Sequence, residues 1–158
     1  MSGKYVANTG EQTVSATQDL VEMQVPNDAT VKVRRVQITQ SSDAGDSESE
    51  QLNATLKRGI GSTSGSGGAA LTPAKKQSGD AASGCTCERN NTTVAVAGGG
   101  SLDDIMDEDF NVMAGLSLVF PPGEEIVLSP GEEFYVNISA PADALTLSCS
   151  VEFVEEGG

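Results

Sequence analysis

Oxygen ligands for a hard cation are concentrated in one short segment of the chain. Residues 41–50 read SSDAGDSESE and hold four carboxylates, those of Asp43, Asp46, Glu48 and Glu50. Calcium takes about six to eight oxygen ligands from flexible acidic loops, so these four residues are the candidate metal site and calcium the candidate cofactor. Their spacing is not that of an EF-hand, and a solvated acidic loop without a metal is the alternative interpretation.

The other acidic residues do not indicate catalysis. A second acidic cluster has the same two interpretations and comprises Asp103, Asp104, Asp107, Glu108 and Asp109. With 23 acidic residues in the chain, some pair of neighbouring carboxylates is expected by chance, so a glycosidase-like pair carries little weight. The chain has no His, the base that nucleophilic triads and most general acid–base sites use. The sequence therefore predicts a protein that is not an enzyme.

The three cysteines do not form a recognisable framework. An odd count, with no signal peptide at the N-terminus, argues against a disulfide scaffold. Cys149 belongs to an alternating apolar row and is predicted to be a small core residue. Cys85 and Cys87 share a face if their segment is extended, but zinc would need further ligands and no His supplies one. Their state, as free thiols or as a disulfide, stays open.

Strands flank the acidic loop and must position it. Val36 and Ile38 alternate with polar residues before it, and Leu52, Ala54 and Leu56 do so after it. Apolar residues two positions apart share one face of a strand, so each segment has one face towards the core and one face towards solvent. Val31 and Val33 have the opposite parity to Val36, which predicts a bulge near Arg34–Arg35.

The C-terminal half continues the same pattern. An alternating row from Phe110 to Phe120 predicts one long core strand, and the preceding residues 102–109 predict a helical turn or an acidic loop. Pro122-Gly123 and Pro130-Gly131 each suit a type II turn that starts a strand. Regular short strands with Pro/Gly turns predict a single all-β domain over residues 1–158. We expect an antiparallel β-sandwich of jelly-roll type with long Gly/Ser-rich and acidic loops.

Two further segments carry partner or loop predictions. Residues 1–16 are expected to form either an edge strand or an arm that pairs with a neighbouring subunit, with Tyr5 as an anchor. Arg34 and Arg35 are either surface ion pairs or contacts to an acidic partner. Residues 59–84 are Gly/Ser-rich and predict a long low-complexity loop. Their glycines do not form a phosphate-binding loop, because no Gly-Lys-Ser/Thr and no helix pattern follows.

Charge and size limit the class of partner. The formal net charge is −14 over 158 residues, which repels nucleic acid and anionic membranes. No apolar run approaches the roughly 20 residues of a membrane helix. The first residues lack the apolar core of a signal peptide, so synthesis and use without Sec export are expected.

Short blocks spread over nearly the whole chain resemble, in order, a group of small head-associated structural proteins of tailed bacteriophages, some of which are decoration (cement) proteins. The blocks are Ala16–Glu22, Val36–Asp46, Leu56–Gly59, Ser64–Gly68, Thr72-Pro73, Asn90–Thr93, Ile126–Pro130 and Pro141–Thr146. In place of residues 102–109 the relatives carry a less charged, aromatic-containing segment, so that stretch is not part of the resemblance.

The resemblance implies a capsid-associated β-sandwich that is made in the host cytoplasm and located on the virion. Its partner would be the major capsid protein, and it would self-associate, with a trimer favoured. A minor tail, fibre or vertex component is one alternative function. A carbohydrate-binding module is another, for which only Tyr5 and Tyr135 look available as exposed aromatic residues.

Overall fold

The computed structural model describes residues 2–42 and 50–157, and within them it contains strands but no helix. The strands are β1 (Ser2–Val14), β2 (Gln18–Gln24), β3 (Ala29–Gln40), β4 (Gln51–Ile60), β5 (Ala69–Leu71), β6 (Ala74–Lys75), β7 (Thr86–Asn91), β8 (Ser101–Asn111), β9 (Leu116–Val119), β10 (Ile126–Leu128), β11 (Glu133–Ile138) and β12 (Leu145–Gly157). This part of the chain therefore has no helix long and apolar enough to cross a membrane.

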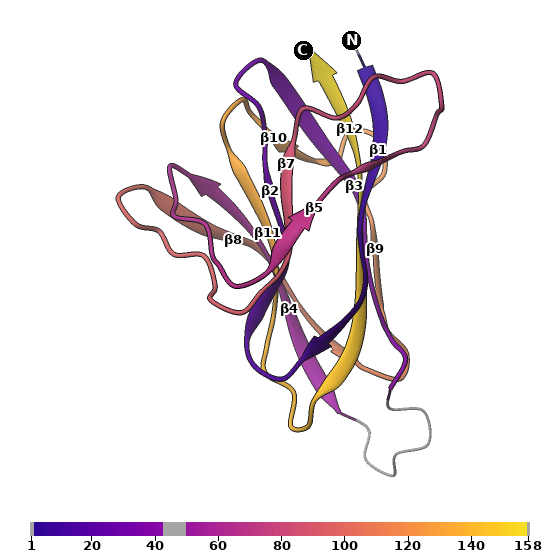
Figure 1. Cartoon of the computed structure of the whole chain (residues 1–158), viewed down its shortest axis with the longest axis vertical. Helices are drawn as coiled ribbons and strands as arrows, with labels where there is room; N and C mark the ends of the chain where they lie inside the picture. The colour runs from indigo at the N-terminus through magenta and orange to yellow at the C-terminus, as the bar shows by residue number, and fades with distance from the viewer. Residues whose placement is uncertain (1, 43–49, 158) are drawn as a thin grey trace.

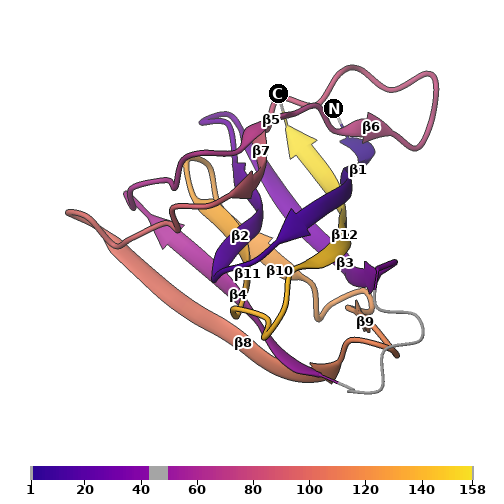
Figure 2. The same ribbon diagram turned by 60° about the horizontal axis from the view of Figure 1, so that its bottom comes forward.

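The strands form two antiparallel sheets packed face to face (Figure 1). Sheet A has the order β10-β3-β12-β1-β6, with β9 also paired to β3, and sheet B has the order β5-β7-β2-β11-β4-β8. Figure 2 shows the two layers from a second direction, with β12 and β1 in one and β11 and β4 in the other. The antiparallel β-sandwich predicted from the sequence is confirmed.

Four strand pairs are nested in the order of the chain. β1 pairs with β12, β2 with β11, β3 with β10, and β4 with β8. Members of each pair lie in one sheet, and successive pairs alternate between the sheets. The four pairs are therefore nested along the chain and shared between the two sheets.

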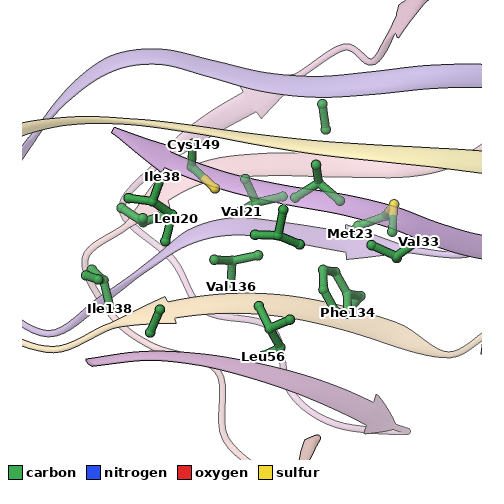
Figure 3. Close-up of a cluster of buried hydrophobic side chains, with 14 of the residues drawn as sticks. Leu20, Val21, Met23, Val33, Ile38, Leu56, Phe134, Val136, Ile138 and Cys149 are labelled. Carbon is green, nitrogen blue, oxygen red and sulfur yellow. The ribbon is translucent and has the colours of Figure 1, made fainter. Parts of the chain in front are cut away.

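The core lies between the sheets and is filled by the alternate apolar residues of the long strands. Figure 3 shows Val33, Ile38 and Cys149 of sheet A facing Val21, Leu56 and Val136 of sheet B. Each of these side chains is at most 1% exposed. Burying one such aliphatic side chain contributes roughly 1.5–3 kcal/mol, so this interface is the main source of stability. Cys149 is a core residue, as predicted.

A bulge at Arg34 changes the phase of β3. Arg35 lies opposite Glu152 and Val33 opposite Phe153, so Arg34 is the extra residue. The bulge lets Val31 and Val33 face the core on one side of it, and Val36 and Ile38 on the other; all four are fully buried. The predicted bulge is confirmed.

Both Pro-Gly pairs form the expected turns. Gly123 and Gly131 have φ angles of 93° and 79°, which a residue with a side chain rarely adopts. The Glu124 N–H donates to the Pro121 carbonyl at 2.9 Å, and the Glu132 N–H donates to the Ser129 carbonyl at 3.1 Å. Strands β10 and β11 follow these turns directly.

Two predictions about residues 102–120 are wrong. Residues 102–109 are neither a helical turn nor a loop, because they belong to strand β8. The row from Phe110 to Phe120 is not one strand: β8 ends at Asn111 in sheet B, and β9 begins at Leu116 in sheet A. Gly115 has a φ of 71°, and the Asn111 side chain accepts the Met113 N–H at 2.9 Å, which together make the turn between the sheets.

Residues 59–84 are more ordered than the predicted loop. They include the end of β4, strands β5 and β6, and backbone pairing of Thr63 with Val96 and of Ser66 with Thr93. At the N-terminus, β1 pairs along its length with β12 of its own chain and over two residues with β6. Residues 2–14 are therefore an outer strand of sheet A in this chain rather than a free arm.

Candidate functional site

The outer face of sheet B carries a buried layer of polar side chains. Every residue of β11 is buried, and so are six of the seven residues of β2, although only one face of each strand meets the core. The outward-facing members are polar or ionisable, and they are Asp19, Glu22, Glu133, Tyr135 and Asn137. Segments 61–68 and 92–97, joined by the Thr63–Val96 and Ser66–Thr93 backbone pairs, lie over this face.

Glu22 anchors the Gly/Ser-rich segment to the sheet. Its two carboxylate oxygens accept the Gly65 N–H at 2.9 and 3.1 Å. A Cβ at Gly65 would lie 2.1 Å from the Thr93 carbonyl oxygen, so only glycine permits this close approach. The Glu22 side chain is 4% exposed, and the contact is therefore sheltered from water.

Asp19 and Asn91 make matching contacts nearby. One oxygen of Asp19 accepts the Ala95 N–H at 2.7 Å, and the other accepts the Asn137 side-chain amide at 2.7 Å. Asn91 accepts the Gly68 N–H at 3.0 Å and donates to Glu88 at 2.8 Å. Side chains of β2 and β7 thus hold both covering segments through their backbone N–H groups, a role in which carboxylates form strong hydrogen bonds.

A small cavity lies beside this layer. It has a volume of about 160 Å³ and is lined by Glu22, Glu88, Glu133, Tyr135 and Gly65 among others. The Ser62 hydroxyl lies 2.7 Å from the Tyr135 hydroxyl and donates to Glu133 at 3.1 Å. Burial raises the pKa of Tyr135, so this hydroxyl is a hydrogen-bonding group rather than an acid near neutral pH.

The electrostatics of Glu22 differ from those of a surface carboxylate. Its pKa is raised to about 7, mainly by burial and also by the nearby charge of Asp19, while hydrogen bonds from Asn91 and Gly65 act in the opposite direction. A carboxylate that titrates near neutral pH is a feature of acid–base sites. Here both oxygens already accept a backbone N–H, so the group acts as a structural acceptor.

The predicted calcium loop can be judged at one residue only. Asp43, Asp46 and Glu48 lie outside the described residues, so the calcium hypothesis stays a prediction. Glu50 is described, and its carboxylate accepts the Ala142 N–H. In the described part of the chain no three acidic or cysteine side chains are arranged to hold a metal ion.

The predicted partner-binding residues make contacts within the chain. Tyr5 is 3% exposed, packs on Phe153 with ring centroids 5.5 Å apart, and donates to the Ala81 carbonyl at 3.0 Å. Arg34 pairs with Glu125 at 3.3 Å, and Arg35 pairs with Glu152 at 3.0 Å. Tyr135 is also buried, so the expectation that Tyr5 and Tyr135 offer exposed aromatic rings is wrong.

Cys85 and Cys87 are buried free thiols at one end of β7. They share a face, as expected for an extended segment, because Thr86 between them is exposed. Burial raises the pKa of Cys85 to about 12 and raises that of Cys87 as well. A thiol that stays protonated is a poor nucleophile, so these cysteines behave as small apolar residues.

Sequence patterns did not identify the buried polar layer. Charged residues at alternate positions of a strand predict a solvent-exposed face. Here that face is buried because the two covering segments lie over it. The available signal was the glycine-rich composition of residues 59–68, since closely spaced N–H groups without side chains suit the binding of carboxylates.

No protein family, curated protein or solved structure matches the chain.

Proposed function

We propose that this chain is a non-catalytic structural protein of a phage virion, a decoration or cement protein that binds the outside of the capsid and stabilises the assembled shell. The observation that carries the proposal is the nested pairing of four pairs of strands. This order over two sheets fits a jelly roll, an architecture common in viral capsid and lectin domains. A lectin role has less support, because Tyr5 and Tyr135 are buried.

The fold alone does not give a function, so a second observation is needed. Three of the blocks that resemble phage head proteins come together in the structure: Ala16–Glu22, Ser64–Gly68 and Asn90–Thr93. Glu22 binds Gly65, Asn91 binds Gly68, and Ser66 pairs with Thr93. Blocks far apart in sequence thus build one structural unit, which favours a shared scaffold over chance similarity.

The buried polar groups also support a structural role. The buried carboxylates of Asp19 and Glu22 accept backbone N–H groups of the covering segments. The formal net charge of −14 opposes binding to packaged DNA.

Stabilisation would follow from binding the assembled shell and not its separate subunits. A protein that contacts several capsid subunits at once gains effective concentration, so individually weak contacts add up to firm attachment. Binding only to the assembled state shifts the equilibrium towards it by mass action. Self-association, with a trimer favoured, would multiply these contacts further.

The first test is the copy number of this chain in purified virions. Quantitative mass spectrometry would give its ratio to the major capsid protein. A ratio near one, or a simple fraction of it, is expected for a lattice-wide decoration protein. A handful of copies would indicate a tail, fibre or vertex component, and absence from the particle would overturn a virion role.

The second test measures stability directly. Shells that lack this protein should release their DNA at a lower temperature, detected with a DNA-binding dye, and purified protein added back should restore the original temperature. An unrelated protein of similar net charge is the control for non-specific effects. Equal release temperatures with and without the protein would contradict the cement role.

A further inference from the structure

β8 is a long strand whose outer edge pairs with no other strand among the described residues. It spans eleven residues, Ser101–Asn111, and forms its ladder with β4 alone. Figure 2 shows it along one margin of the molecule. In the described part of the chain no backbone hydrogen bond joins its other edge to a further strand. An unpaired edge of this length presents a row of N–H and C=O groups that a further strand can bind.

The other sheet edges are closed by different means. The outermost strands β5, β6, β9 and β10 have only two to four residues each. β1 continues past β6, but its Thr9 and Thr13 carbonyls accept side-chain hydrogen bonds from Arg89 and Asn90. Both β1 and β8 contain a register shift; that of β8 lies at Ile105, and residues 106–111 pair regularly with β4 beyond it. β8 is therefore the edge best able to take an additional strand.

An apolar groove lies beside the first half of β8. Its volume is about 620 Å³, and it runs between β8 and the segment from Phe120 to β10. Ile105 and Val127 line it and remain 37% and 46% exposed. Four carboxylates and one cation, Arg58, also line the groove. A strand placed on the free edge could put alternate apolar side chains into this groove.

The charge of β8 selects the kind of strand that can bind. Its eleven residues hold five carboxylates and no cation, and in the neighbouring strand Lys57 pairs with Asp104 at 3.5 Å. Two copies of β8 paired with each other would set these carboxylates side by side, and like charges in adjacent strands are destabilising. The acidic edge thus opposes self-pairing and favours a basic partner.

We propose that β8 is a docking edge for a partner protein, and that the partner adds an extended segment in which basic residues alternate with apolar ones. The backbone of that segment would continue sheet B, its apolar side chains would enter the groove beside Ile105, and its cations would meet the β8 carboxylates. This inference goes beyond the proposed function, because it depends only on β8 and its neighbours and not on a virion setting.

The test uses the full chain and a labelled peptide of about ten residues that alternates lysine and valine. Fluorescence anisotropy would measure binding, and hydrogen exchange followed by mass spectrometry would locate it. We expect binding that weakens as salt increases, together with slower exchange of the amides in residues 101–111. Exchange elsewhere on the surface should not change.

Three controls separate strand addition from simple charge attraction. A peptide with glutamate in place of lysine should not bind, and a peptide with alternate backbone amides N-methylated should bind much more weakly because it cannot form the ladder. The double variant Asp103→Asn/Asp104→Asn should bind about tenfold more weakly, from two rim charges lost. Its matched control, Glu11→Gln/Asp143→Asn, removes the same charge at exposed sites away from β8 and should bind like the parent.

Two results would overturn the proposal. Equal binding of the N-methylated peptide, or peptide binding without protection of residues 101–111, would show that β8 does not accept a strand. Protection of β8 in the protein alone, rising with concentration alongside dimer formation in sedimentation, would assign the edge to a second copy instead.

Discussion

The Glu22 carboxylate binds the backbone N–H of Gly65, a residue 43 positions away, with both of its oxygens. This contact fixes a glycine-rich segment over a sheet that would otherwise expose a row of polar side chains. Because the carboxylate is buried and near Asp19, its protonation is coupled to the stability of the fold.

Stability should fall as the pH rises through neutrality. The pKa of Glu22 is about 7 in the folded chain and near 4.5 in an unfolded one, so folding favours the protonated form. The stabilisation is complete below pH 4.5 and is lost as the pH passes 7. Thermal melts at pH 5.5 and pH 8 should show the decrease, and Glu22→Gln should remove most of it.

Glu11→Gln is the matched control for that experiment, because Glu11 is exposed and the variant changes the net charge equally. The control should keep the full decrease in melting temperature. A Glu22→Gln variant whose pH dependence equals that of the parent would show that another group is responsible.

Gly65→Ala should destabilise the chain by about 1–3 kcal/mol. The added Cβ would lie 2.1 Å from the Thr93 carbonyl oxygen and 2.4 Å from a Glu22 oxygen, so the covering segment would have to move. Urea unfolding measures the loss. Gly79→Ala is the control, since no atom lies within 4 Å of its Cβ position, and equal stability of the two variants would contradict the anchoring role of Gly65.

All three cysteines should resist thiol reagents in the folded protein. Cys85, Cys87 and Cys149 are at most 6% exposed, and burial raises the pKa of each thiol. Reaction with Ellman's reagent at pH 8 should be more than about tenfold slower in buffer than in urea, where the thiols are accessible. Rapid labelling of one thiol in buffer would mean that its strand opens readily.

Deletion of Arg34 should be tolerated better than deletion of Gln37. Arg34 is the extra residue of the β3 bulge, so its removal leaves Val31, Val33, Val36 and Ile38 in one continuous alternation. Removing Gln37 instead shifts one side of the strand by a residue and turns core side chains outward. Melting temperatures of the two deletion variants compare these costs, and a larger loss for the Arg34 deletion would refute the argument.

Features of the fold were predictable where a local sequence pattern permits only one backbone structure. A change of parity between Val33 and Val36 requires an extra residue, and Pro-Gly at 122–123 and 130–131 specifies a turn, so both features were predictable. Alternation misled at residues 110–120, because a turn that spans an even number of positions keeps the parity of the row. Asn111 and Gly115, which make that turn, were the residues in the sequence that argued against one continuous strand.

Burial of the outer face of sheet B was harder to predict from the sequence. The acidic residues of β8 predicted a helical turn or a loop. β8 is instead an edge strand, which forms backbone hydrogen bonds with one neighbouring strand, β4, and tolerates charged side chains. Conversely, Glu22 and Glu133 look exposed from their alternation and are buried by a segment whose Gly65 lies 43 positions from Glu22 along the chain. Only the three-dimensional path of residues 61–68 decides between these outcomes.

The position of β12 between β3 and β1 also governs when the protein can fold. Its residues are the last of the described chain to leave the ribosome, and until they do, β1 lacks the neighbour with which it pairs along its length. At a translation rate of roughly 5–20 residues per second, β1 waits for several seconds or more with an open apolar face. Sheet A therefore cannot close until β12 has been synthesised, and until then β1 and β3 lack the strand that joins them.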